Sequence, residues 1–173
     1  LSLDPYMRGR MKDVKSYAAP TKIGEVMLGG TVGRVLWSRT PRFSSGEIVE
    51  GALGWQSHAV SDGIGIRKVN ESVAPIQTNL GILGMPGMTA YFGLLDVCEP
   101  IPGDTVVVSA ASGAVGQVVG QIAKIMGCRV IGTAGSDDKV NYIVQELGFD
   151  TGINYKTQNV SEALRNSCPY GVD

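Results

Sequence analysis

The sequence predicts an α/β protein with two unlike halves: a small β-barrel or sandwich, then a parallel sheet with crossover helices. Short alternating apolar stretches separated by glycines fill residues 1 to about 75, and helical periods alternate with apolar β-runs after about residue 80. Hydrophobic residues make up 43% of the chain and charged residues 18%, which is typical of a globular protein. We predict domains 1–78 and 79–173.

The first half contains three stretches with the alternation of β-strands. They read GGTVGRVLWS, GEIVEGALGWQSHAV and IGIRKV, with glycine turns between them. The opening residues, LSLDPYMRGR, have a strand-like start that runs directly into a turn. Short strands joined in this way predict the small barrel or sandwich.

The second half has the order strand, turn, helix, strand. A turn at Pro102–Asp104 precedes an apolar run, Thr105–Ala110, that suits a strand buried on both faces. The helical pattern of AVGQVVGQIAKIMG stops at Gly127, and strands follow at Arg129–Ala134 and Gly152–Asn154. This βαβ unit predicts a right-handed crossover within a parallel sheet.

The turn after the first of these strands reads ASGAVG and has the features of a phosphate-binding loop. Gly113 lets the backbone approach a pyrophosphate, and the free N–H groups and dipole of the following helix favour the anion. Gly116 allows the helix to pack closely on the strand, while Ala111 replaces the first glycine of G-x-G-x-x-G. The alternative is a tight turn without a ligand.

The end of the second strand indicates NADP rather than NAD. Residues 133–136 are neutral, whereas an NAD site has an acid there for the ribose 2′-hydroxyl. Lys139 follows in the first turn of a helix that we expect Ser136 to cap, with Asp137 and Asp138 as first-turn acids. A cation there costs roughly 0.3 to 1 kcal/mol unless an anion such as a 2′-phosphate lies beside it. The alternative is a solvated lysine balanced by the two acids.

Charge and cysteine content narrow the range of partners. The 15 basic and 16 acidic residues form no basic cluster, which argues against nucleic acid and anionic membranes. Three widely spaced cysteines favour reduced thiols in the cytoplasm over disulfides or a zinc knuckle, and His58 stands apart from other ligand residues, so we expect no metal. No apolar run approaches the roughly 20 residues that cross a bilayer. We expect a cytoplasmic protein with a small-molecule partner.

The ends suggest part of a longer protein. The chain opens without methionine, and its last residues, PYGVD, begin what looks like a new segment. About three parallel strands are visible, whereas a complete dinucleotide-binding sheet has about six. We therefore expect half of the sheet to lie outside this sequence.

Four separated motifs resemble those of one enzyme family. They are LSLDPYMRGRM, LGMPGMTAYFGLLD, VVVSAASGAVGQVVGQIAKIMGCRVIGTAGSDDKV and ELGFDTGINYK. They are similar to the zinc-independent medium-chain dehydrogenase/reductases, in the branch of prostaglandin/leukotriene-type reductases, plant alkenal double-bond reductases and bacterial NADPH-dependent curcumin reductases. The resemblance covers the whole chain. It implies a partial GroES-like β-barrel domain followed by the first half of a Rossmann-type sheet with flanking helices.

The resemblance also implies an activity. The family uses NADPH to reduce the carbon–carbon double bond of α,β-unsaturated ketones and aldehydes, by hydride transfer to the β-carbon. Quinone reduction stays open, because quinones are conjugated carbonyl compounds too. Outside the enzymes, the alternative is a truncated, non-catalytic NADPH-binding fragment. The resemblance further implies that the complete protein is a homodimer.

The resemblance assigns roles residue by residue. The loop residues lie against the pyrophosphate, Lys139 meets the 2′-phosphate with Tyr155 near it, and Met85 and Thr89 lie beside the nicotinamide. Tyr6 lines the substrate cleft and is a candidate hydrogen-bond donor to the enolate oxygen. Simpler roles compete: a surface tyrosine for Tyr155, a core filler for Met85 and an anchor of the first turn for Tyr6. The implied cofactor-binding residues are Met85, Thr89, Gly113, Ala114, Val115, Gly116, Lys139 and Tyr155.

Overall fold

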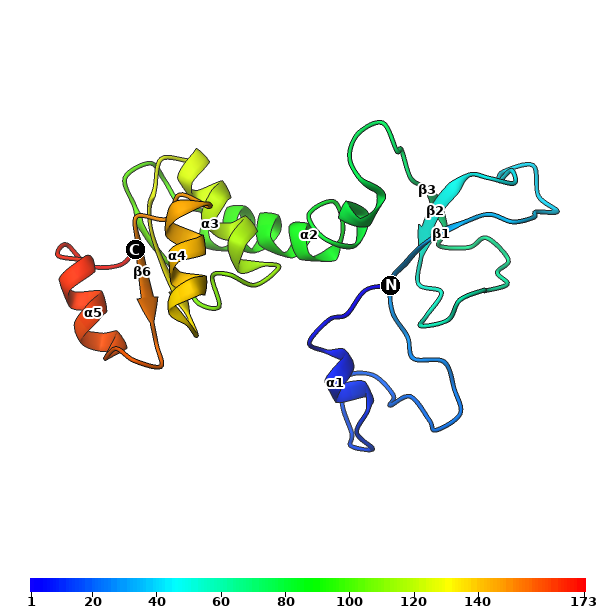
Figure 1. Ribbon diagram of the computed structural model, residues 1–173, viewed down its shortest axis with the longest axis horizontal. Helices are drawn as coiled ribbons and strands as arrows, with labels where there is room; N and C mark the ends of the chain where they lie inside the picture. Colours follow the sequence, from blue (N-terminus) through cyan, green and yellow to red (C-terminus); the bar gives the residue numbers. More distant parts are fainter. The chain divides into compact units, whose positions relative to one another are not determined.

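The computed structural model describes residues 1–173 and divides into two compact units, Leu1–Leu80 and Gly81–Asp173 (Figure 1). The first unit holds a three-stranded antiparallel sheet, and the second holds a three-stranded parallel sheet with helices. The predicted α/β class is therefore confirmed.

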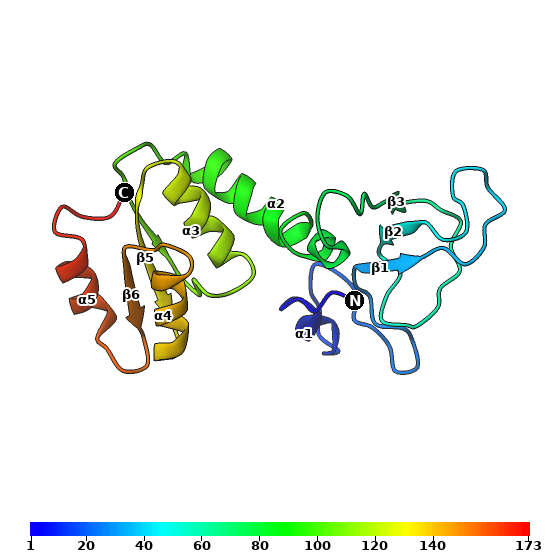
Figure 2. The ribbon, with the colours of Figure 1, turned by 45° about the horizontal axis from the view of Figure 1, so that its top comes forward.

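The antiparallel sheet of the first unit has the order β1-β2-β3. Its strands are β1 (Thr31–Arg34), β2 (Ile48–Gly51) and β3 (Arg67–Lys68), one within each predicted stretch. Phe43, Val49 and Ile66 form a small buried core beside it, with Val35 and Leu53 packed against them. Most of the remaining chain in this unit runs as loops around these short strands (Figure 2).

The N-terminal segment of the first unit is held by Ser2 and does not form the strand that the sequence suggested. The Ser2 N–H donates to the Gly30 carbonyl at 2.8 Å, and the Trp55 indole N–H donates to the Ser2 carbonyl at 2.9 Å. The chain then turns at Pro5 into one helical turn, α1 (Met7–Arg10), because no further residue pairs with the sheet. A 3₁₀ helix, η1 (Ile76–Leu80), closes the unit.

The parallel sheet of the second unit has the order β4-β5-β6. Its strands are β4 (Thr105–Val108), β5 (Arg129–Ala134) and β6 (Thr151–Asn154), close to the predicted ranges. The first strand ends at Val108 and not at Ala110, because Ala110 has a φ of 47°, in the left-handed region. The strand order and direction are those of a βαβαβ half-sheet.

Helices cover both faces of this sheet (Figures 1 and 2). One face packs on α3 (Gly116–Ile125) and α4 (Asp137–Gln145) around buried Val130 and Ile143. On the other face, α5 (Val160–Ser167) covers Ile131 and Ile153. This covering explains why the strands are apolar on both sides.

A long helical segment precedes β4. It begins as α2 (Met85–Phe92) and continues as a π-helix, η2 (Gly93–Cys98), whose Leu94 joins the core beneath α3 and α4. Near its start, Gly87 lies against the carbonyl of Ile82, where any Cβ would overlap the oxygen. No helix in the chain is long and apolar enough to span a membrane.

Asp150 ties the end of α3 to the start of β5. Its carboxylate accepts a hydrogen bond from the Lys124 ammonium at 2.8 Å and from the Val130 N–H at 2.7 Å. Burial alone raises the pKa of Asp150, but the bonds from Lys124 and Val130 prevail and hold it below the ordinary value of 3.8. The ionised form of Asp150 therefore stabilises the fold.

Asp150→Asn should lower the free energy of unfolding by about 1 kcal/mol at pH 7, because the pair is partly exposed. The folded pKa is depressed, so this contribution is complete above pH 3.8 and is lost as the pH falls through the folded value. Urea titrations at a series of pH values should show the difference from wild type shrinking in acid. Glu146→Gln, an exposed position, is the control; a difference that stays constant with pH contradicts the ion-pair role.

Candidate functional site

The turn between β4 and α3 is built on tight backbone packing. The Ala111 N–H donates to the Thr133 carbonyl of β5 at 3.0 Å, and Ala111 is fully buried. Its methyl group fills the space beside Gly132, where an added Cβ would lie 2.8 Å from it. Ala111 stands where the motif has its first glycine. Its methyl group fits there because Gly132, on the neighbouring strand β5, has no side chain.

The two glycines of the turn have different surroundings. A Cβ on Gly116 would lie 2.5 Å from the Ala110 oxygen and 2.9 Å from the Ala111 Cα, so the helix begins in direct contact with the turn backbone. A Cβ on Gly113 would meet only the Ala110 oxygen, at 3.0 Å, and its other side is exposed. Gly116 is thus required by packing, whereas Gly113 leaves an open backbone surface.

Several N–H groups of this turn donate to no acceptor in the protein. The Gly113 N–H bonds the Ala110 carbonyl at 2.8 Å, but the next three residues, Ala114, Val115 and Gly116, have no such bond. Ala114 and Val115 directly precede α3 and Gly116 begins it, where the helix dipole adds positive potential. Unpaired donors beside an exposed glycine are chemically suited to bind an anion.

The carboxyl end of β5 carries no acid. Ser136 caps α4 as predicted: its hydroxyl accepts the Lys139 N–H at 3.4 Å. Lys139 is exposed and belongs to none of the three ion pairs of the chain. Asp137 instead accepts a hydrogen bond from the Asn154 amide at 2.6 Å. Lys139 is therefore not neutralised by an ion pair with either neighbouring acid.

Tyr155 lies at the same strand end. Its N–H donates to the Ala134 carbonyl at 3.1 Å, and its hydroxyl oxygen is 2.6 Å from the position that a Cβ on Gly135 would take. About half of the side chain is exposed. The structure thus places the phenol against the end of β5, where Ser136 begins the helix that carries Lys139.

Met85 and Thr89 lie on successive turns of α2. The Thr89 hydroxyl donates to the Met85 carbonyl at 2.7 Å, which leaves its oxygen lone pairs free to accept a hydrogen bond. Met85 is 49% exposed, which argues against the core-filling role. These two residues share one side of the helix, as an i, i+4 pair does.

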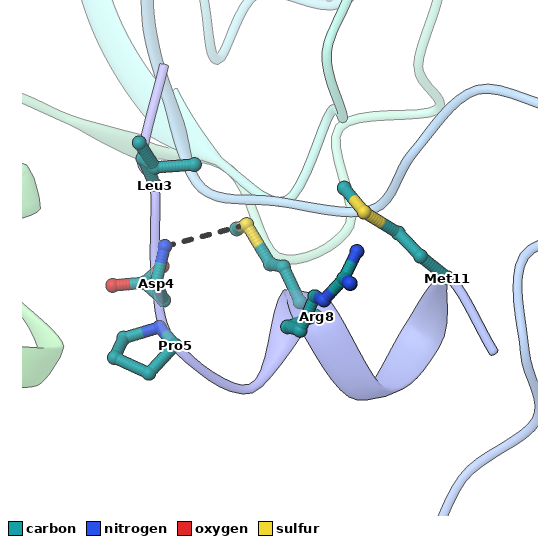
Figure 3. A pocket seen from close by; sticks show the side chains of 6 residues that line it. Leu3, Asp4, Pro5, Arg8 and Met11 are labelled. Atoms are coloured by element: carbon teal, nitrogen blue, oxygen red, sulfur yellow. Dashed lines mark hydrogen bonds between the residues drawn. The ribbon is translucent and has the colours of Figure 1, made fainter.

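Tyr6 immediately precedes α1, and its ring is 36% exposed. A cavity of about 350 Å³ lies beside this segment, but Tyr6 is not among its lining residues (Figure 3). The Asp4 N–H in its wall donates to the Met7 sulfur at 3.4 Å. The lining residues are Leu3, Asp4, Pro5, Met7, Arg8 and Met11.

The thiols do not form a metal or nucleophile site. No group of three or more His, Cys, Asp or Glu side chains could hold a metal ion, and His58 contacts only the Ser57 hydroxyl. Cys98 is exposed, whereas Cys128 and Cys168 are buried. Burial, with a smaller contribution from Asp104, raises the pKa of the Cys128 thiol, so it stays protonated.

Two family models match separate parts of the chain. A family model described as the N-terminal domain of oxidoreductase matches residues 1–69, and one described as zinc-binding dehydrogenase matches residues 114–173. NADPH-dependent curcumin reductase of Escherichia coli is 49% identical over 173 residues, and prostaglandin reductase 1 of Rattus norvegicus is 51% identical over 177 residues. Each match covers the whole chain, with 50% and 51% of the relative respectively.

Over its whole length the chain is similar to the zinc-independent medium-chain dehydrogenase/reductases. Among solved structures of this family, CurA of Vibrio vulnificus in complex with NADPH superposes with a TM-score of 0.93 at 50% identity. That match covers 99% of the chain and 51% of CurA. The chain therefore spans about half the length of the relatives it matches.

Two polar residues at the end of β6 were not predicted from the sequence. Asn154 is only 5% exposed, and its side chain bonds both Asp137 and the backbone N–H of Lys156. The side chain of Lys156 reaches Gly135. The available signal was NYK directly after a buried strand, in which only the tyrosine was singled out.

The two glycines of the turn should respond differently to a methyl group. Gly116→Ala should cost about 1 to 3 kcal/mol of stability, because the contact atoms are backbone and cannot rotate away. Gly113→Ala should cost less than that but should weaken binding of an anion, because the methyl covers the open backbone. Urea unfolding and titration with 2′,5′-ADP measure the two effects. Equal losses of stability with unchanged binding contradict this division of roles.

Proposed function

We propose that the protein reduces the carbon–carbon double bond of α,β-unsaturated ketones and aldehydes with NADPH. The observation that carries this proposal is the end of β5, where neutral residues, an unpaired Lys139 and the Tyr155 phenol suit a 2′-phosphate. The relatives are named as NADPH-dependent curcumin reductase and prostaglandin reductase 1, and curcumin is a conjugated carbonyl compound. Their names support the substrate class as well as the cofactor.

The residues present fit this cofactor. The unpaired N–H groups of Ala114, Val115 and Gly116 would hold the pyrophosphate, and Gly113 would let it approach. Met85 and Thr89 would lie beside the nicotinamide. NADPH supplies the hydride when bound. The protein has to orient the two reactants and exclude water.

Reduction of an enone places negative charge on the carbonyl oxygen. A hydrogen-bond donor beside that oxygen stabilises the charge. We propose Tyr6 for this role because it is partly exposed and precedes α1 beside an apolar cavity. Tyr6→Phe should lower turnover with little effect on NADPH binding.

We further propose that the complete protein is a cytoplasmic homodimer. The three cysteines form no disulfide, which supports a reducing compartment. The dimer rests on the resemblance to the family. Size-exclusion chromatography with light scattering measures the oligomeric state.

The first test is NADPH oxidation by the purified chain with 3-nonen-2-one, in parallel with NADH and with a quinone. We expect consumption of NADPH and a product saturated at the carbon–carbon double bond, identified by mass spectrometry. Faster turnover of the quinone than of the enone would favour quinone reduction. NADPH binding without turnover would favour a non-catalytic binding fragment.

Lys139→Ala should weaken NADPH binding by roughly 1 to 3 kcal/mol, the range for hydrogen bonds to charged groups. NADH lacks the 2′-phosphate, so its affinity should stay nearly unchanged. Calorimetric titrations with both cofactors measure the difference. Equal losses for NADPH and NADH contradict the assignment of Lys139 to the 2′-phosphate.

A further inference from the structure

We propose that Lys156 is a second cationic determinant for the 2′-phosphate, in addition to Lys139. This inference rests on the proposed function and adds a residue to the same subsite. The Lys156 Cε lies 3.5 Å from the position that a Cβ on Gly135 would take, so the side chain crosses the carboxyl end of β5. In dinucleotide-binding sheets, residues at the carboxyl end of the second strand, here β5, recognise the group on the 2′ position of the adenosine ribose.

The side chains of Tyr155 and Lys156 can approach the end of β5 because Gly135 has no side chain of its own. The Tyr155 hydroxyl oxygen and Cζ lie 2.6 and 3.1 Å from the same Cβ position, so no larger residue fits without moving the phenol. The phenol and the aliphatic stem of Lys156 therefore cover Gly135 together. The ammonium group is one bond beyond Cε and lies at the same strand end as the Tyr155 hydroxyl.

The Asn154 side chain fixes the backbone that carries Lys156. Its oxygen accepts the Lys156 N–H at 3.1 Å, and its amide donates to Asp137. The Asn154 carbonyl also accepts the N–H groups of Thr157 and Gln158, at 3.2 and 2.9 Å. Because Asn154 is buried, this turn is anchored before any ligand binds, and little backbone order remains to be gained on binding.

The charges around this turn favour an anion. Neither Lys156 nor Lys139 belongs to an ion pair, and the amide of Asn154 engages the carboxylate of Asp137. Residues 133–136 add no negative charge. A phosphate monoester carries about two negative charges near neutral pH and can accept hydrogen bonds from both ammonium groups and a phenol. The site is therefore built for the doubly charged substituent.

The experiment compares 2′,5′-ADP with 5′-AMP, which differ only by the 2′-phosphate, in calorimetric titrations of the chain. We expect Lys156→Met to weaken binding of 2′,5′-ADP and NADPH by about three- to tenfold, and binding of 5′-AMP and NADH by less than about twofold. Lys156→Arg should retain most of the affinity. Arg165→Gln, which removes one exposed positive charge on α5, is the matched control and should change neither titration. Unchanged urea unfolding shows that the variants are folded.

The outcomes separate this inference from the proposed function. Loss of 2′,5′-ADP affinity in Lys139→Ala but not in Lys156→Met overturns the role of Lys156 alone. Equal weakening of 5′-AMP binding, or the same effect in Arg165→Gln, also overturns it, because the charge would then act without regard to the 2′ position. A wild-type chain that binds 2′,5′-ADP no better than 5′-AMP overturns the proposed cofactor and this inference with it.

Discussion

The contact of Gly116 with the backbone of Ala110 and Ala111 is the constraint on which the rest of the second unit depends. It sets the distance between the start of α3 and the end of β4, because no side chain can separate them. The left-handed conformation of Ala110 lets the chain reverse within this short space, at a cost of order 1 to 2 kcal/mol for a residue with a Cβ. The same geometry leaves the N–H groups of Ala114, Val115 and Gly116 without acceptors.

Strand β5 links the two halves of the candidate cofactor site. On one side, its Thr133 carbonyl accepts the Ala111 N–H of the glycine turn, and on the other its Ala134 carbonyl accepts the Tyr155 N–H after β6. The proposed pyrophosphate loop and Tyr155, proposed to lie near the 2′-phosphate, are thus hydrogen-bonded to successive residues of one central strand. Their spacing follows from the regular geometry of the sheet rather than from flexible side chains.

The parts that could be predicted from sequence are those with local physical signals. Apolar runs predicted the parallel strands, and the helical pattern that ends at Gly127 predicted α3. Ser136 followed by two acidic residues predicted the start of α4. The conformation of Ala110 was missed, because positive φ is rare for alanine and has no signature in the sequence. The Asn154–Asp137 bond, which joins residues 17 apart, and the approach of Lys156 to Gly135 were missed because only the sheet brings these segments together.

The burial of two of the three thiols has a chemical consequence under the proposed function, whose substrates are conjugated carbonyl compounds. Such compounds are soft electrophiles that alkylate thiolates, and a thiol that stays protonated inside the core reacts slowly. Cys128, whose pKa burial raises, and the buried Cys168 are therefore shielded from the proposed substrates. Cys98, exposed at the end of η2, is the thiol left open to alkylation, so inactivation by the proposed substrates would begin there and not in the core.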